Sequence, residues 1–436
     1  MKILPIAATV LPLTALALAI SGPTYADNNE YILFQDGSGN TANADQSDPT
    51  ISDNLIEQVQ IGTTNSVDAS QTNGNNSSTI SQYQEGSNNV SLSTQDGNTN
   101  STVETSAIGD NNDLETTQTS NATSFIGVYV TGNGNEIENM QTGNSDTTVI
   151  YAIEGNNNDG ESFQANNSNV SASFTVVGEG NRPDLNQQNS DSSTAISETY
   201  GDSNDPTPIQ TDVSNSTITI FQTGNTHVGT VQDRTGGANN ISSLTQTGNS
   251  HLTNSTIASS FNQTNNLVQN GNGNSINAEI NNANNSTAVA LQSGRFHNLT
   301  IFQTNVSDSY VSVTQSDIIN VAVVNQSGSG HMAEVIQMDD SSNINVDQDN
   351  ADNSLYALQN GVDNLIDAVQ NGVSEIAMLS QTGTVNEIDL TQSGTLNTAI
   401  LTQNGNDNTL TVTQTGTSDT ITAIQLGDNN SGTISQ

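Results

Sequence analysis

Residues 392–403 read QSGTLNTAILTQ, and this unit decides the fold because it recurs with a period of eleven residues. Its Gln returns at every eleventh position up to residue 436: Gln326, Gln337, Gln348, Gln359, Gln370, Gln381, Gln392, Gln403, Gln414, Gln425 and Gln436. A Gly follows most of these residues by two places, at Gly328, Gly361, Gly372, Gly383, Gly394, Gly405, Gly416 and Gly427. An Asn precedes most of them by six places, at Asn320, Asn353, Asn364, Asn386, Asn397, Asn408 and Asn430.

Aliphatic residues occupy alternate positions between each Asn and the next Gln. In the quoted unit, Ala399 and Leu401 lie between Asn397 and Gln403, whereas the residues beside them follow no rule. Successive side chains of a strand point to opposite faces, so a period of two indicates a strand with one buried face. Each unit is therefore predicted to form a strand of about seven residues followed by a tight turn.

One such strand cannot bury its apolar face alone, but stacked repeats can. The predicted fold class is all-β, a β-solenoid with two short strands per coil, about 22 residues per coil, and amyloid-like cross-β stacking. Gln and Asn side chains of successive coils would then pair in ladders, which satisfies their buried donors and acceptors. The Gly that follows Gln suits a turn with positive φ.

The chain divides into three expected segments. Residues 1–26 resemble a secretory signal, because Lys2 precedes an apolar run that ends in small residues near Ala26. Residues 27–50 are expected to be an N-terminal leader segment, and residues 51–436 are expected to form the solenoid. Its pattern is irregular around 99–215, where Pro183 is expected to weaken a coil, and most regular over 292–436. Counting units predicts about 18 coils in a rod of roughly 85 Å, with no membrane span in the mature chain.

Composition narrows the possible functions. Only 31% of the 436 residues are hydrophobic, which is too little for an ordinary globular core of this length. Four Lys and Arg residues stand against 45 Asp and Glu residues, giving a formal net charge of −41. Nucleic-acid binding is not expected, since neutralising phosphates requires many cations. There is no Cys, and therefore no disulfide framework and no thiolate chemistry.

No catalytic, cofactor or metal site is expected, and the chain is not predicted to be an enzyme. His297 and His331 stand in the Asn position six before Gln, while His227 and His251 are expected in turns, stacked on adjacent coils. Filling these slots is a simpler role for the four His residues than metal ligation. Acidic turns could bind calcium only weakly, because the nonapeptide motif of calcium-binding solenoids is absent.

The unit from Gln392 to Gln403 matches the curlin repeat in full, and most other units match with Ile, Leu or Val in place of Ala399. The chain therefore resembles the curli fibre subunits of Gram-negative bacteria over residues 51–436, although it is longer and more acidic. The resemblance implies a β-solenoid amyloid subunit that leaves the periplasm through an outer-membrane secretion pore and polymerises at the cell surface. It also implies partners, namely other copies of the chain, other curlin-like subunits or a nucleator, and roles in biofilm matrix, adhesion and aggregation.

Two functions are weighed on this basis. The first is a secreted structural protein that forms an extracellular, pilus-like or fimbrial fibre, since the pattern continues unbroken to Gln436 and leaves a strand edge open to another chain. The alternative is a monomeric β-solenoid adhesin or a surface-, ice- or glycan-binding module. Fibre formation by the purified mature chain separates the two.

Overall fold

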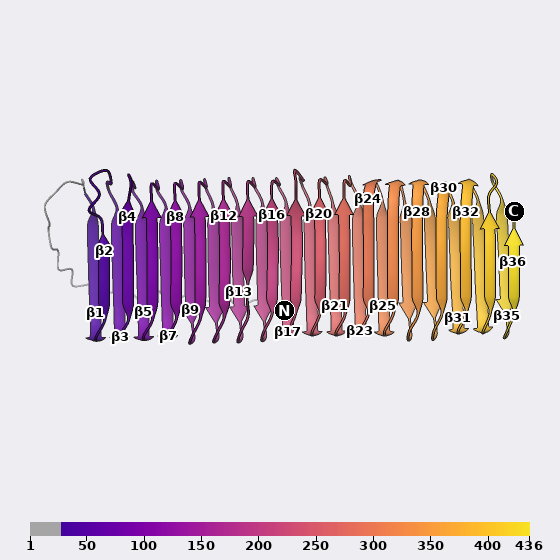
Figure 1. Ribbon diagram of the computed structural model, residues 1–436, viewed down its shortest axis with the longest axis horizontal. Helices are drawn as coiled ribbons and strands as arrows, with labels where there is room; N and C mark the ends of the chain where they lie inside the picture. The colour runs from indigo at the N-terminus through magenta and orange to yellow at the C-terminus, as the bar shows by residue number, and fades with distance from the viewer. Residues whose placement is uncertain (1–27) are drawn as a thin grey trace, which may run out of the picture.

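The computed structural model describes residues 28–436, so the expected signal segment, residues 1–26, lies outside the described residues. These residues form a straight rod of 36 strands joined by short turns, with the strands lying across the long axis (Figure 1). The strands alternate between two parallel sheets of 18 strands, so each coil contributes one strand to each sheet. The predicted fold class, an all-β solenoid with two strands per coil, is confirmed. No helix that could cross a membrane occurs in this part of the chain.

The odd-numbered strands form one wall of the rod, called here the odd-strand sheet. Their bounds are β1 Glu30–Ser38, β3 Leu55–Thr63, β5 Thr79–Ser87, β7 Thr102–Asp110, β9 Phe125–Thr131, β11 Thr148–Glu154, β13 Ser171–Val177, β15 Thr194–Tyr200, β17 Thr217–Asn225, β19 Ile241–Asn249, β21 Thr264–Asn272, β23 Thr287–Arg295, β25 Tyr310–Ile318, β27 Met332–Met338, β29 Ser354–Asn360, β31 Ile376–Thr384, β33 Thr398–Asn406 and β35 Thr420–Leu426.

The even-numbered strands form the opposite wall, the even-strand sheet. Their bounds are β2 Thr41–Asp45, β4 Ser66–Thr72, β6 Val90–Asp96, β8 Asp113–Thr119, β10 Glu136–Thr142, β12 Asp159–Ala165, β14 Asp184–Gln188, β16 Asp205–Thr211, β18 Val228–Arg234, β20 Leu252–Ala258, β22 Ser275–Asn281, β24 Asn298–Ser307, β26 Val321–Ser329, β28 Asn343–Ala351, β30 Leu365–Val373, β32 Glu387–Thr395, β34 Thr409–Gln414 and β36 Ser431–Ser435.

Coil length changes along the rod. The expected length, two repeat units per coil, holds in the C-terminal part, where Val321 pairs with Asn343. Through the middle most coils are one residue longer, since Thr102 pairs with Phe125, and a few are longer still, since Thr217 pairs with Ile241. An added corner residue, which forms its own row of parallel bridges from Ser52 to Ser307, accounts for the longer coils. The interval 99–215 is thus stacked in a steady register even though its eleven-residue pattern fades.

The first coil lies within the segment that the sequence set apart as a leader. Strands β1 and β2 pair in parallel with β3 and β4, across a coil slightly longer than those that follow. The inward Gln35 takes the same position as Gln60 of the next coil. Residues 30–45 therefore belong to the solenoid.

The core is a narrow seam of alternate side chains between the two sheets. In β33, for example, Ala399 and Leu401 are buried while the residues beside them are not. The largest buried side chains, Tyr151 and Phe174, stack on adjacent coils with ring centroids 4.6 Å apart. Gly160 leaves room for the tyrosine ring, since a Cβ there would lie 3.1 Å from it. The narrow core thus accommodates a bulky side chain only where the residue facing it on the opposite strand is small.

Proline interrupts the stacking at one coil. Pro183 directly precedes β14, which is shortened to Asp184–Gln188. Only Asn186, Gln187 and Gln188 of this strand pair with β16, because Pro206 and Pro208 of β16 have no N–H to donate toward β14. A proline offers no N–H for a ladder bond, so the strand begins after it.

Candidate functional site: amide ladders and strand edges

Buried glutamines form an unbroken ladder along the C-terminal part of the odd-strand sheet. The Nε2 of each Gln donates to the Oε1 of the Gln one coil further on, at 2.8–3.1 Å. The members are Gln315, Gln337, Gln359, Gln381, Gln403 and Gln425. All donors point in the same direction along the rod, so the ladder is polar.

A second ladder runs along the even-strand sheet with the same direction and spacing. Its members are Gln303, Gln326, Gln348, Gln370, Gln392 and Gln414, joined at 2.8–3.0 Å. Gln436 follows in phase, but it is exposed, and it is held by its backbone N–H, which donates to the Thr413 carbonyl at 2.9 Å. Gln392 to Gln414 is therefore the last amide-to-amide step of this ladder among the described residues.

Most of the ladder Gln residues also tie the two sheets together. The Nε2 of Gln337 donates to the backbone carbonyl of Val321 at 2.9 Å, and that of Gln348 donates to the carbonyl of Met332 at 2.9 Å. Both carbonyls stand at the start of the preceding strand, in the opposite sheet. An unpaired buried amide costs about 1–3 kcal/mol, so these two acceptors make the Gln position a strong determinant of register.

The Gln ladder of each sheet is interrupted over a different part of the rod. In the odd-strand sheet the Gln slot holds Ala107, Val130, Ile153, Val176 and Thr199 over five consecutive coils. In the even-strand sheet it holds Asp233, Ile257 and Ile280 over three. The two interruptions do not overlap, so every coil keeps at least one Gln in its slot. Where a new ladder begins, the Oε1 atoms of Gln222 and Gln303 are buried without a hydrogen-bond donor.

Part of the even-strand ladder was not among the residues predicted from the eleven-residue period. Gln95, Gln118, Gln141, Gln164, Gln187 and Gln210 are joined at 2.6–2.9 Å. They lie in the region where the odd-strand slots hold apolar residues, so the half-coil repeat is lost. The sequence signal that identifies them is their constant spacing, which exceeds two repeat units by one residue.

The asparagines at the strand starts pair mainly with backbone rather than with one another. The Oδ1 of Asn364 accepts the backbone N–H of Asn386 at 3.0 Å, and the Nδ2 of Asn386 donates to the Gly405 carbonyl at 2.8 Å. Direct amide-to-amide bonds, at 2.9–3.1 Å, accompany these contacts at Asn386, Asn408 and Asn430. The side chain is one methylene shorter than Gln, which keeps it close to the next coil's backbone.

The expected Asn positions fall into two rows. Asn320, Asn364, Asn386, Asn408 and Asn430 precede strands of the even-strand sheet, whereas Asn353 and Asn397 precede β29 and β33 of the odd-strand sheet. In the second row His331, Glu375 and Asp419 take the intervening slots. Glu375 is buried there, and Asn397 donates to its Oε1 at 3.3 Å while its Oε2 has no hydrogen-bond partner.

All four histidines occupy Asn slots, and His227 and His251 lie between strands with their rings stacked on adjacent coils, as expected. The backbone N–H of His227 donates to Asn204 Oδ1, and that of His251 donates to His227 Nδ1. The same row continues through Asn274 to His297. Sequence phase concealed this because the Gln six places after them is replaced by Asp233 and Ile257.

The imidazoles of this row are held neutral. Burial lowers the pKa of His227 to about 4 and also lowers the pKa values of His251 and His297. Their Nδ1 atoms accept backbone N–H groups of the next coil, which requires the unprotonated form. Among residues 28–436, no group of three or more His, Cys, Asp or Glu residues could hold a metal ion.

The turn glycines allow the coils to approach closely. Gly361 has φ +128°, and a Cβ on it would lie 1.9 Å from the carbonyl oxygen of Gly383. Gly328, Gly383, Gly394, Gly405 and Gly427 also have positive φ, whereas Gly372 and Gly416 do not. Asp339 and Asn350, which replace Gly, adopt φ of 74° and 77°. Positive φ is thus a common feature of this turn without being universal.

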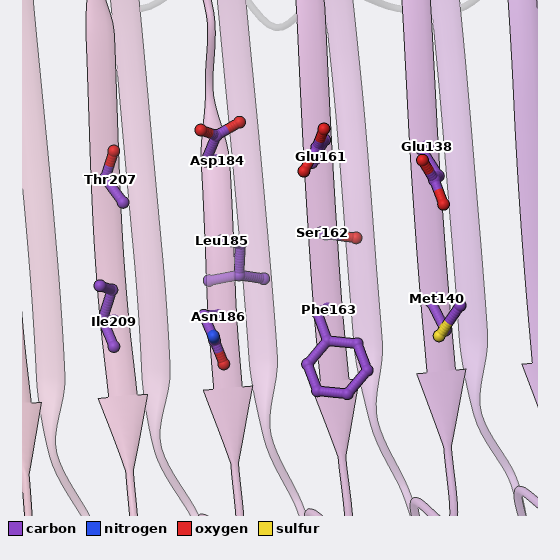
Figure 2. Close-up of a pocket in the computed structure, with 10 residues that line it drawn as sticks. All are labelled: Glu138, Met140, Glu161, Ser162, Phe163, Asp184, Leu185, Asn186, Thr207 and Ile209. Carbon is purple, nitrogen blue, oxygen red and sulfur yellow. The ribbon is translucent and has the colours of Figure 1, made fainter.

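A shallow hollow of about 380 Å³ lies on the outer face of the even-strand sheet beside Pro183 (Figure 2). Glu138, Glu161 and Asp184 stand in a row on its adjoining strands, with Phe163 beside them. Burial and the nearby carboxylates raise the pKa of Asp184 to about 6. The in-register stacking therefore places like charges side by side along this face.

The first and the last coil of residues 28–436 each pair on one side only within this range. Within the described residues, β1 and β2 pair only with β3 and β4, and β35 and β36 pair only with β33 and β34. The inward Tyr31 and Leu33 of the first coil are each 39% exposed, although their counterparts in later coils are buried. Every strand pair is parallel and every Gln ladder has one direction, so the rod is polar along its length.

Comparison with known proteins supports the reading of the repeat. Residues 383–416 match the family model of the curlin associated repeat, which includes the unit quoted at the outset. No curated protein matches the chain. The repeat and the β-solenoid together fit a structural or adhesive protein rather than an enzyme.

Proposed function

From the match of residues 383–416 to the curlin associated repeat, we propose that this chain is a curlin-repeat protein, a secreted subunit that polymerises end to end into extracellular amyloid fibres. Such fibres serve in biofilm matrix, surface adhesion and cell aggregation. The partners are other copies of the chain, other curlin-like subunits or a nucleator, and an outer-membrane pore that receives it from the periplasm.

One observation carries this proposal: the rod keeps the same two parallel sheets and one ladder direction along its length, with strand edges at both of its described ends. Its ladder amides all donate toward the C-terminal end, for example Gln403 to Gln425 at 2.8 Å. At the other end Gln35 donates to Gln60 at 2.6 Å, which leaves the Oε1 of Gln35 facing outward. A second copy added in the same direction would continue both sheets and the odd-strand ladder without a change of register.

The direction of the backbone N–H groups of β36 allows a specific test of end-to-end growth. Gln436 donates its N–H to β34, and the Asn430 carbonyl accepts from Thr409. In a parallel strand the residues alternate between the two neighbours, so Thr433 directs its N–H away from β34, toward the open edge. Thr433→Pro removes that donor while sparing the bonds to β34.

The experiment follows thioflavin fluorescence and electron microscopy of the purified chain lacking residues 1–26. The wild-type chain and Thr433→Val, which keeps the donor, are expected to form fibres at similar rates, and Thr433→Pro is expected to elongate about tenfold more slowly. A wild-type chain that stays monomeric at high concentration would favour the adhesin alternative. Fibres that grow equally fast from all three chains would place the growing contact elsewhere.

A further inference from the structure

The outer face of the odd-strand sheet between β23 and β33 is rich in large apolar side chains, with Ser and Thr between them. It carries six exposed large side chains: Leu291, Tyr310, Met332, Ile376, Met378 and Ile400. Met378 is 50% exposed and Ile376 is 45% exposed. The register aligns them along the rod, because Tyr310 pairs with Met332 and Met378 pairs with Ile400. We call this surface the apolar face.

Charge is nearly absent from the apolar face but not from the opposite wall. Between the start of each strand and its Gln, Glu334 is the carboxylate that the odd strands β23 to β33 direct outward. On the even-strand sheet of the same coils, the outward positions include Asp347, Asp367, Glu387 and Asp389. The two sheets share one repeat and one core, so the repeat does not by itself explain why only the even-strand sheet carries many outward carboxylates.

Exposed large apolar side chains that gather on one face of a protein mark a contact site. Six strands about 4.8 Å apart and seven residues of about 3.3 Å each span roughly 29 Å by 23 Å, or about 650 Å². Two copies meeting on this face would bury roughly 1,300 Å² in total, which reaches the size of a stable protein interface. Sheets pack face to face in this manner at about 10 Å separation.

We propose that a second copy of this chain docks side by side on the apolar face, odd-strand sheet against odd-strand sheet. The chain has a net charge of −41 and only four Lys and Arg residues, so copies repel one another across their acidic surfaces. Contact between two apolar faces is the lateral approach that avoids setting rows of carboxylates against each other. Lateral docking uses different residues from end-to-end stacking and does not depend on it.

Glu334 sets the strength of this contact. It lies between Ser312 and Tyr356 in its row, within the surface that docking covers. Each copy would bring one such carboxylate into the interface, and burying it without a cation opposes docking at neutral pH. Glu334→Gln keeps the shape of the side chain and removes that cost, so it is expected to tighten the pair.

Sedimentation velocity of the freshly purified chain lacking residues 1–26 tests the proposal before fibres grow. The wild-type chain is expected to form a dimer with a low frictional ratio, because side-by-side rods are less elongated than an end-to-end pair. Ile376→Lys with Met378→Lys is expected to weaken the dimer about tenfold or more, and Glu334→Gln is expected to strengthen it.

The matched control places the same charges on the other wall. Leu365→Lys with Val369→Lys changes outward residues of β30, the strand that directly precedes β31, and is expected to leave the dimer at wild-type strength or above. Far-UV circular dichroism of every variant verifies the β-solenoid. A wild-type chain that is monomeric at its highest soluble concentration, or equal effects of the two lysine pairs, would overturn the proposal.

The outcomes separate lateral docking from the proposed fibre. Single fibres growing from a chain that shows no compact dimer would refute the lateral contact and leave end-to-end growth standing. Compact dimers that never elongate would do the reverse. Protection of the apolar face only by added lipid vesicles, with no dimer, would assign the face to a membrane surface and would also refute the proposal.

Discussion

The imidazole rings of His227 and His251 lie parallel on adjacent coils, with centroids 5.0 Å apart and planes 3° from each other. His227 Nδ1 accepts the backbone N–H of His251 at 3.3 Å, and His251 Nδ1 accepts that of Asn274 at 3.2 Å. The stacking and the coil-to-coil hydrogen bonds therefore both require neutral rings. Protonation would break the bonds and set like charges against each other.

Acidification is expected to loosen the coils around this pair. Burial lowers the pKa of His227 from 6.5 to about 4, so the unfolded chain takes up the proton first as the pH falls. Stability from this residue is fully present above about pH 7 and is lost between about pH 6.5 and 4, by up to about 3 kcal/mol. Hydrogen exchange of β18 and β20 at pH 7.5 and pH 5 measures the loss.

A variant isolates the histidine contribution from that of the many carboxylates. His227→Asn with His251→Asn keeps the row of strand-start side chains, since Asn204 and Asn274 already occupy it. Between pH 7.5 and 5, these coils are expected to lose less protection in the variant than in the wild-type chain. Equal losses in both chains would show that the histidines do not control the pH response.

Asp233 is expected to act with the opposite sign. It stands in a Gln slot of the even-strand sheet, and burial raises its pKa to about 6 although Asn240 donates to it at 3.0 Å. The folded chain therefore binds this proton more readily than the unfolded chain, and stability falls as the pH rises from about 4 to about 6. Asp233→Asn is expected to stabilise the fold by about 1–3 kcal/mol at pH 8 and to make little difference at pH 4, as measured by urea denaturation.

Interrupting a Gln ladder is expected to be costly. Gln381→Leu leaves the Nε2 of Gln359 and the Oε1 of Gln403 without their ladder partners, so it should destabilise the fold by about 2–4 kcal/mol. Gln436→Leu changes an exposed side chain at the same phase and should cost less than about 0.5 kcal/mol. Urea denaturation of the two variants compares these costs, and similar values would show that the ladder contributes little.

The turn glycines differ in what they tolerate. Gly361→Ala would place a Cβ 1.9 Å from a backbone carbonyl of the next coil, whereas a Cβ on Gly236 would meet nothing within 4 Å. Both have positive φ, so Gly236→Ala carries only the conformational cost of about 1 kcal/mol. Gly361→Ala is expected to cost at least about 3 kcal/mol, or to prevent folding, because two backbones would have to separate. Thermal unfolding monitored by circular dichroism measures the difference.

The repeat predicts the fold because the same residue pattern determines where each strand lies, which face it buries and how it pairs with its neighbours. The alternation around Gln403 specifies the strand, its buried face and its register, so the two-stranded coil could be inferred without any long-range information. The same reasoning located the ladder glutamines from Gln326 to Gln425, which depend only on phase.

Features that depend on a neighbouring coil were harder to predict. The ladder through Gln118 to Gln210 was missed because apolar residues such as Val130 replace Gln in the facing sheet, and their burial depends on the other wall. The Asn slot of His227 was not recognised because the residue six places later, which should be Gln, is Asp233. Residues 30–45 lack a full eleven-residue unit, and pairing with β3 and β4 specifies their strands.

Fibre diffraction from the purified chain lacking residues 1–26 tests the central claim most directly, namely that amide ladders join coils into a rod which other copies extend. Aligned samples are expected to give a sharp meridional reflection near 4.7–4.8 Å, parallel to the fibre axis, that weakens in Thr433→Pro. A reflection perpendicular to the fibre axis, or soluble particles with no cross-β repeat, would contradict the account.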